Sequence, residues 1–230
     1  MHYLILLYGD EAGATEPGTP EFAAEMAGYE AFGELAAEAI RGGAALQLVD
    51  TARHVRHDGD EVVVTDGPYA EATEVLGGYY VLEADHLDEV IDLVRHIPAT
   101  SAPGGGSEIR PLVSFNDFKG LDEAGMGRTT LATLHGPQAE ARDHEAFVAA
   151  HRDQVAVGAA LDPTAAATTV RVVDGEVLVS DGPYAEALEV AGGLYVLDAG
   201  DHTERLATEV PVGDGGIVEL RPVMDLSAIA

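Results

Sequence analysis

The sequence predicts an α+β fold that is built from two similar units in tandem. The hexapeptide DGPYAE occurs at Asp66–Glu71 and again at Asp181–Glu186. The same offset of 115 residues (181 − 66) aligns the surrounding segments, for example Gly43–Leu46 with Gly158–Leu161. Each copy alternates short apolar runs with amphipathic stretches, which indicates strands and helices in one domain. The offset of 115 residues is much longer than the period of a solenoid repeat, which is about 20–50 residues. Each copy is therefore long enough to be a domain of its own.

The first half of each unit is predicted to contain a strand, a helix and a hairpin. Residues Tyr3–Tyr8 form a continuous apolar run, as expected for a strand at the centre of a sheet. Over Phe22–Ile40, apolar side chains recur at helical spacing with glutamates on the other side, which predicts an amphipathic helix that ends at two glycines. Two strands, at residues 55–56 and 61–65, flank an Asp-Gly-Asp turn and are expected to form a hairpin.

The second half of each unit is predicted to add a strand, a helix and a closing strand. Residues Gly78–Glu83 are the expected strand, and Asp85 is the expected N-cap of a helix that Pro98 terminates. Asp201 occupies the equivalent capping place in the second unit. Residues Ile109–Val113 close the unit as its last strand. The order β-α-β-β-β-α-β predicts a ferredoxin-like unit with both helices on one face of the sheet.

Two such units leave two uncovered sheet faces, so we expect the sheets to pack on each other as an internal pseudo-dimer. The first domain is predicted at residues 1–115 and the second at 129–230. The linker is predicted at 116–128, because Ser114–Arg128 has no sustained period and contains three glycines.

The composition limits the classes of partner. Lys and Arg number 12 against 41 Asp and Glu, which gives a formal net charge of −29. Such a surface repels phosphate backbones and anionic lipids, so neither nucleic acid nor a membrane is an expected partner. The negative charge either keeps the protein in solution or attracts a cationic partner protein. The absence of cysteine is compatible with a cytoplasmic protein, and homo-oligomers beyond the fused pair remain open.

The repeated motif resembles a known family. Tyr8-Gly9-Asp10-Glu11 after the first strand, the DGPYAE hexapeptide followed by a Gly-Gly strand, and the closing segment Glu108–Leu112 are together similar to the YCII-related domains that carry a DGPF motif. Both copies have tyrosine, at Tyr69 and Tyr184, where that motif has phenylalanine. The resemblance covers almost the whole of both units.

The resemblance implies two ferredoxin-like units paired into a dimeric α+β barrel. It also implies an acid–base site with a His–Asp pair and a link to sigma-factor systems. Asp66 and Asp181 match the motif aspartate. The first helix has Tyr29 in the first unit where the second unit has His144. The two units therefore need not be equally competent in acid–base chemistry.

The DGPY loop admits two interpretations. As a structural element it is a rigid corner between sheets, because the aspartate accepts backbone N–H groups and the proline fixes its own φ. As a functional element it brings carboxylates and a phenol together for cofactor-independent proton transfer, isomerisation or elimination on a small molecule. No cofactor or metal is expected. The candidate catalytic residues are Asp66, Asp181 and His151, and the candidate ligand-binding residues are Tyr69, Glu71, Tyr80, Tyr184, Glu186, Tyr195 and His144.

Two functional hypotheses therefore remain open at the level of the sequence. The first is an enzyme that performs acid–base chemistry on a small molecule with the two motif aspartates. The second is a non-catalytic binding or regulatory module that serves a sigma-factor system, as the family resemblance implies.

Overall fold

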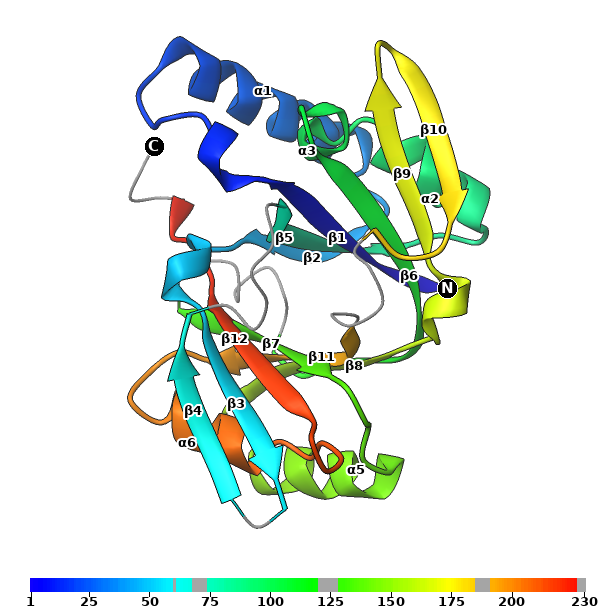
Figure 1. Cartoon of the computed structure of the whole chain (residues 1–230). Helices are drawn as coiled ribbons and strands as arrows, with labels where there is room; N and C mark the ends of the chain where they lie inside the picture. Colours follow the sequence, from blue (N-terminus) through cyan, green and yellow to red (C-terminus); the bar gives the residue numbers. More distant parts are fainter. Residues whose placement is uncertain (60, 68–73, 120–127, 185–190, 227–230) are drawn as a thin grey trace.

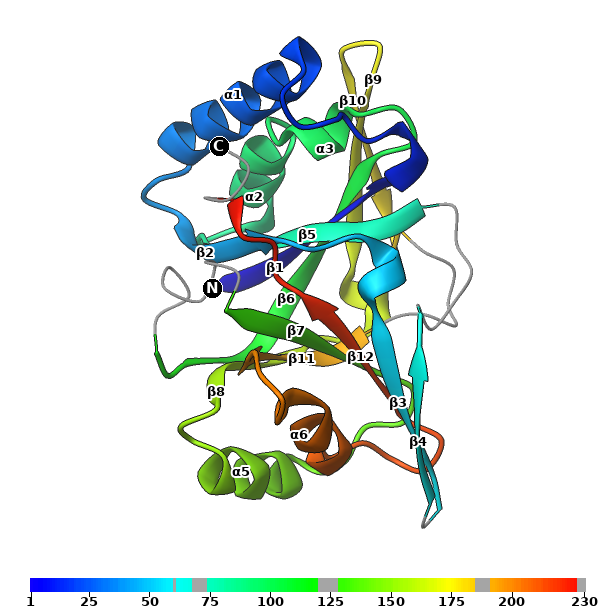
Figure 2. The same cartoon turned by 90° about the vertical axis from the view of Figure 1, so that its left-hand side faces the viewer.

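Two antiparallel sheets face each other, and helices cover the outer face of each (Figures 1 and 2). The structure is a computed structural model that describes residues 1–59, 61–67, 74–119, 128–184 and 191–226. None of the helices in these ranges is long and apolar enough to cross a membrane. The predicted α+β class and the packing of one sheet on the other are confirmed.

The two units contain matching elements in the same order, except that α3 has no counterpart among the described elements of the second unit. The first consists of β1 (His2–Asp10), α1 (Pro20–Leu35), β2 (Ile40–Ala45), β3 (Arg53–Asp58), β4 (Glu61–Asp66), β5 (Glu74–Glu83), α2 (Leu87–Val94), α3 (Pro98–Ser101) and β6 (Gly106–Asp117). The second consists of β7 (Thr129–His135), α5 (Ala141–Ala150), β8 (Val155–Leu161), β9 (Thr168–Val173), β10 (Glu176–Asp181), β11 (Ala191–Asp198), α6 (Thr203–Glu209) and β12 (Ile217–Pro222).

The hairpin of each unit belongs to the sheet of the other unit. Strand β3 pairs with β12, with Val55 opposite Val218, and β9 pairs with β6, with Glu108 opposite Thr169. One sheet therefore has the order β2-β5-β1-β6-β9-β10 and the other β8-β11-β7-β12-β3-β4. The sequence predicted the hairpins but did not predict this exchange, which interlocks the two units (Figure 1).

The two sheets are also joined at both seams, so they enclose a barrel. At one seam the second half of β6 pairs with β8, with Leu112 opposite Leu161. At the other seam Leu46 forms a bridge with Val223, and the Gln47 N–H donates to the Pro222 carbonyl at 2.9 Å. Backbone hydrogen bonds therefore close the barrel at both seams.

Side chains alternate between the inside of the barrel and the helix layers, as they must along a strand. The inner cluster includes Leu4, Tyr79, Val81 and Leu194. The neighbouring Leu82 instead packs with Phe32 under the helices of the first unit. Three apolar clusters result, one inside the barrel and one beneath each helix layer.

The first helix is shorter than predicted, and the next segment is a strand. Helix α1 ends at Leu35, and residues Ile40–Ala45 form β2. The sequence pattern did not predict this strand, because the segment is rich in glycine. Gly43 is needed there because a Cβ atom would lie 2.6 Å from a ring carbon of Tyr80. Asp85 and Asp201 are also not the helix N-caps, since His86 and His202 occupy those positions.

Candidate functional site

Charged side chains occupy equivalent places on the inner face of each sheet. Strand pairing sets Leu6 opposite Glu108 and Leu4 opposite Arg110, and both leucines belong to the inner apolar cluster. Opposed residues of paired strands lie on the same face, so Glu108 and Arg110 share it. We define the first cluster as Tyr8, Glu108, Arg110 and Tyr184, and the second cluster as Thr133, His135, Glu219 and Arg221.

The first cluster is centred on a fully buried ion pair. The side chains of Glu108 and Arg110 are 2% and 1% exposed, and Arg110 Nη1 lies 3.3 Å from Glu108 Oε1. Arg110 also donates to the backbone carbonyls of Asp162 at 2.6 Å and Ala191 at 3.1 Å, both in the second unit. The guanidinium group therefore joins the two units from within the barrel.

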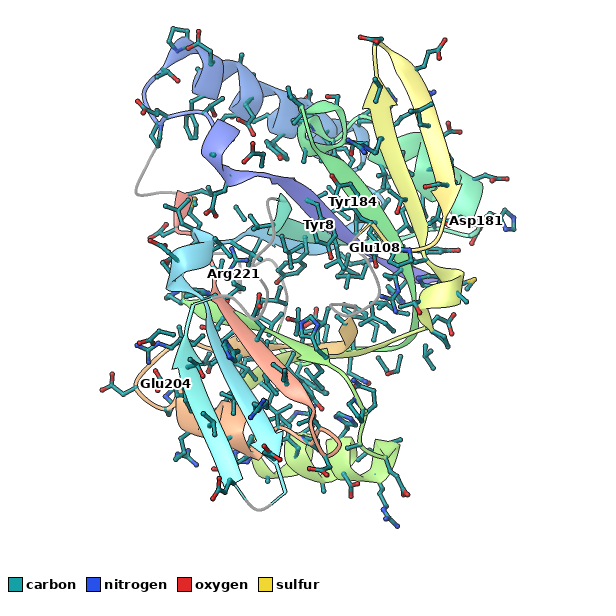
Figure 3. All side chains as sticks on the ribbon, viewed as in Figure 1. Tyr8, Glu108, Asp181, Tyr184, Glu204 and Arg221 are labelled. Carbon is teal, nitrogen blue, oxygen red and sulfur yellow. The ribbon has the colours of Figure 1, made fainter. Side chains whose placement is uncertain are left out.

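The second DGPY motif completes this cluster. The Tyr184 N–H donates to Glu108 Oε2 at 2.9 Å, and the Tyr184 hydroxyl donates to the Gly104 carbonyl at 2.6 Å. The ring of Tyr184 stacks on Tyr8 with 4.9 Å between centroids (Figure 3). Gly106 makes room for it, because a Cβ atom there would lie 2.4 Å from the ring. The motif of one unit is thus built into the inner face of the other.

The second cluster repeats the arginine contact with different neighbours. Arg221 Nη2 donates to the Gln47 carbonyl at 2.6 Å. Gln47 belongs to the first unit, and it is the counterpart of Asp162 in the second unit. Burial lowers the pKa of Arg221, while the nearby Glu219 and Glu11 oppose that shift. His135 replaces Tyr8, and its Nε2 lies 2.9 Å from Thr133 Oγ1. The two clusters are therefore equivalent in place and unequal in chemistry.

Both arginines keep one buried donor without an acceptor. In the described part of the chain, Arg110 Nε and Arg221 Nε are buried and have no hydrogen-bond partner. Buried polar groups are almost always hydrogen-bonded, and an unpaired one costs about 1–3 kcal/mol. The pattern occurs at equivalent positions of both units, so each cluster has the capacity to receive an oxygen acceptor.

The predicted catalytic aspartates lie outside these clusters. Asp66 ends β4 with a side chain that is 85% exposed, and its Oδ1 lies 3.2 Å from Arg53 Nε. Arg53 also forms an ion pair with Glu204 at the start of α6. Asp181 ends β10 and is exposed, but it lies opposite Thr168, which stands where the first unit has Arg53. The structure therefore does not bring the two aspartates together.

The other predicted site residues fall into three groups: one in the first cluster, four on the helix side of the sheets and three outside the described residues. Tyr184 lies in the first cluster, whereas Tyr69, Glu71 and Glu186 fall outside the described residues. Tyr80, Tyr195, His144 and His151 lie on the helix side of the sheets. His144 Nδ1 lies 2.8 Å from the Tyr195 hydroxyl, and His151 Nε2 lies 2.9 Å from Glu209. The functional roles assigned to all of these residues stay predictions.

The half-buried His144 of α5 gives the stability of the chain a defined pH dependence. Burial lowers the pKa of His144, with a smaller opposing effect of Asp143. The unfolded chain then binds a proton more readily, so this contribution is present above an unfolded pKa of about 6.5 and is lost as the pH falls below it. Between roughly pH 7.5 and 5.5, the melting temperature of the wild type should fall more than that of His144→Gln. Equal falls in circular-dichroism melts would contradict this.

Sequence reasoning missed most of the two clusters, although a signal for them was present. The closing segments EIRP and ELRP place Glu108, Arg110, Glu219 and Arg221 in otherwise apolar strands, two residues apart within each strand. Charges with a period of two lie on one face of a strand, and a sheet that is covered on both faces must bury them. The spacing of the four charged residues therefore indicates positions on the inner faces of the two sheets. Among the described residues, no three metal-ligating side chains lie close enough together to hold a metal ion.

Comparison with known proteins agrees with the repeated architecture. The model of the YCII-related domain matches residues 1–116 and again 130–227. An uncharacterised protein of Rhizobium meliloti strain 1021 is 33% identical over 117 residues, which cover 50% of this chain and 94% of that protein. It therefore corresponds to a single unit. A solved structure described as an anthrone oxidase-like protein aligns over 97% of this chain and 91% of its own, with 10% identity and a TM-score of 0.32.

Proposed function

This chain belongs to the YCII-related domain family, and from that premise we propose that its two units jointly bind a small organic molecule at the first and second clusters. The ligand carries an oxygen acceptor, such as a carboxylate, a carbonyl or a hydroxyl group. The bound molecule contacts residues of both units, because each arginine already donates to backbone carbonyls of the opposite unit.

The observation that carries this proposal is the unpaired Nε–H group of each buried arginine. A guanidinium group presents its donors in a fixed fork, so an N–H that its protein neighbours leave open keeps a defined direction. A ligand oxygen would satisfy that donor in a surrounding from which water is largely excluded. Specificity of this kind is strong, because a molecule that lacks the oxygen leaves the buried donor unpaired.

Binding is better supported than catalysis by the motif aspartates. Asp66 is exposed and already contacts Arg53, and Asp181 is exposed as well. Water competes for the oxygens of an exposed carboxylate, so such a group contributes little to the capture of a small molecule. Acid–base chemistry by these two residues, and the service of a sigma-factor system, stay predictions of the sequence.

The proposal is tested by a thermal-shift screen of the full chain against small organic acids, hydroxy acids, ketones and amides, with amines and hydrocarbons of similar size that lack an oxygen acceptor as controls. A ligand at about 100 times its Kd stabilises the folded state by about 2.7 kcal/mol, which raises the melting temperature of a chain of this size by about 5–10 °C. The stabilising compounds should share an oxygen acceptor. A library in which only purely cationic or apolar compounds stabilise the chain would contradict the proposal.

Matched variants locate the site. Lysine keeps the positive charge but lacks the Nε–H of a guanidinium group. Arg110→Lys and Arg221→Lys should therefore reduce the ligand-induced shift in melting temperature by more than half. Asp66→Asn and Asp181→Asn should retain the shift. If the aspartate variants lose the shift and both arginine variants keep it, the ligand binds at the DGPY loops and the clusters are not the site.

A further inference from the structure

The last strand of each sheet is open along its outer edge. In the described residues, β4 pairs only with β3 and β10 pairs only with β9. Every residue of both strands is exposed, although three consecutive positions in each are apolar. Val62, Val63 and Val64 are 42–43% exposed, and Val177, Leu178 and Val179 are 38–50% exposed. Apolar strand edges of this kind pair readily with another extended chain.

The backbone of each edge has three residues that are directed outward. The Gly182 N–H donates to the Ala167 carbonyl, which continues the β9–β10 ladder by one pair. Bonded and non-bonded pairs alternate in an antiparallel ladder, so Val177, Val179 and Asp181 present their N–H and C=O groups to the open side. The Gly67 N–H donates to the Ala52 carbonyl in the same way, which leaves Val62, Val64 and Asp66 facing outward on β4.

Acidic residues stand at both ends of these edges. Strand β10 begins with Glu176 and ends with Asp181, and β4 begins with Glu61 and ends with Asp66. A second copy of the chain would set acidic residues opposite acidic residues in either strand direction, and like charges directly opposite are destabilising. The formal net charge of −29 adds to that repulsion. The charge pattern therefore selects a basic partner.

We propose that the β10 edge binds an extended peptide segment of a partner protein by strand addition, and that the segment has alternating β-branched residues with Lys or Arg at both ends. Main-chain hydrogen bonds to Val177, Val179 and Asp181 supply affinity, and the terminal charges supply direction and selectivity. The site is separate from the two clusters, because β10 lies at the outer limit of the sheet (Figure 1).

The β4 edge is a weaker second site for the same kind of peptide. Arg53 lies 3.2 Å from Asp66 and offsets its charge, whereas Thr168 occupies that place beside Asp181. Arg56 lies opposite Val63 and its counterpart Arg171 lies opposite Leu178, so this position is the same at both edges and the difference rests on Arg53 and Thr168. A basic peptide is therefore attracted more strongly to β10 than to β4.

Fluorescence anisotropy with the full chain tests the proposal. The probe is a labelled peptide of about seven residues in which valine and threonine alternate between two terminal lysines. Replacing both lysines by glutamate should weaken binding by at least about tenfold, since like charges across an interface cost several kcal/mol. Binding of the lysine peptide should also weaken when the salt concentration is raised to about 0.5 M.

Proline substitution identifies the edge. Val179→Pro removes an outward N–H while keeping the ladder to β9, and it should weaken binding about tenfold, whereas the matched Val64→Pro should weaken it about twofold. Glu176→Lys provides a second test that does not alter the backbone, and it should also reduce affinity. Equal binding of the two peptides, or full binding by both Val179→Pro and Glu176→Lys, overturns the proposal. A dimer in sedimentation runs that Val179→Pro abolishes also overturns it, because the occupant would then be a second copy.

Discussion

Replacing Arg110 by methionine is expected to lower the free energy of unfolding by about 3–5 kcal/mol, the usual cost of removing one partner of a buried ion pair. Three acceptors lose a donor in this variant: Glu108 Oε1 and the carbonyls of Asp162 and Ala191. Glu108 would keep its contact with the Tyr184 N–H, but its charge would be buried without a cation. Urea unfolding followed by circular dichroism measures the effect.

The double variant Glu108→Gln/Arg110→Met is the matched control. It removes the buried charge together with its partner, so it should be more stable than Arg110→Met alone by about 1–3 kcal/mol. The exposed ion pair between Arg53 and Asp66 offers a second comparison, because Asp66→Asn should change stability by less than about 1 kcal/mol. A cost below about 1 kcal/mol for Arg110→Met would show that the buried pair does not hold the two units together.

The elements of the fold could be predicted from local patterns, while their partners could not. Apolar periodicity located β1, α1 and β5, and the Asp-Gly-Asp turn located the β3–β4 hairpin. That hairpin, however, pairs with β12, which is more than 150 residues away in the sequence. Nothing in the hairpin sequence identifies β12 as the strand with which it pairs, because strand pairing of this kind is decided by tertiary packing.

The candidate site could be predicted only in part, and the reason is the position of the motif within the fold. DGPYAE attracted attention to its two aspartates, which lie at exposed strand ends. Of the described motif residues, Tyr184 is the one that enters a cluster, through its backbone N–H and its hydroxyl. The interpretation of the loop as a rigid corner between sheets stays a prediction. The buried pair of β6 and the equivalent Glu219 and Arg221 of β12 were visible in the sequence, but only as part of a repeated signature.

The second large effect concerns the separated units. Without the second unit, the inner face of the first would expose Leu4, Leu6, Tyr79 and Val81, which are all buried in the full chain. Each such side chain is worth about 1.5–3 kcal/mol when buried, so the four together contribute about 6–12 kcal/mol, as much as the net stability of many domains. The β3–β4 hairpin would also lose β12 as its pairing partner.

Sedimentation equilibrium of separately expressed residues 1–116 therefore tests whether each cluster is built jointly by two interlocked units. We expect this fragment to be insoluble or to form a dimer that exchanges hairpins, and we expect co-expression with residues 130–227 to yield a one-to-one complex. A soluble monomer of residues 1–116 that unfolds cooperatively at the melting temperature of the full chain would contradict it.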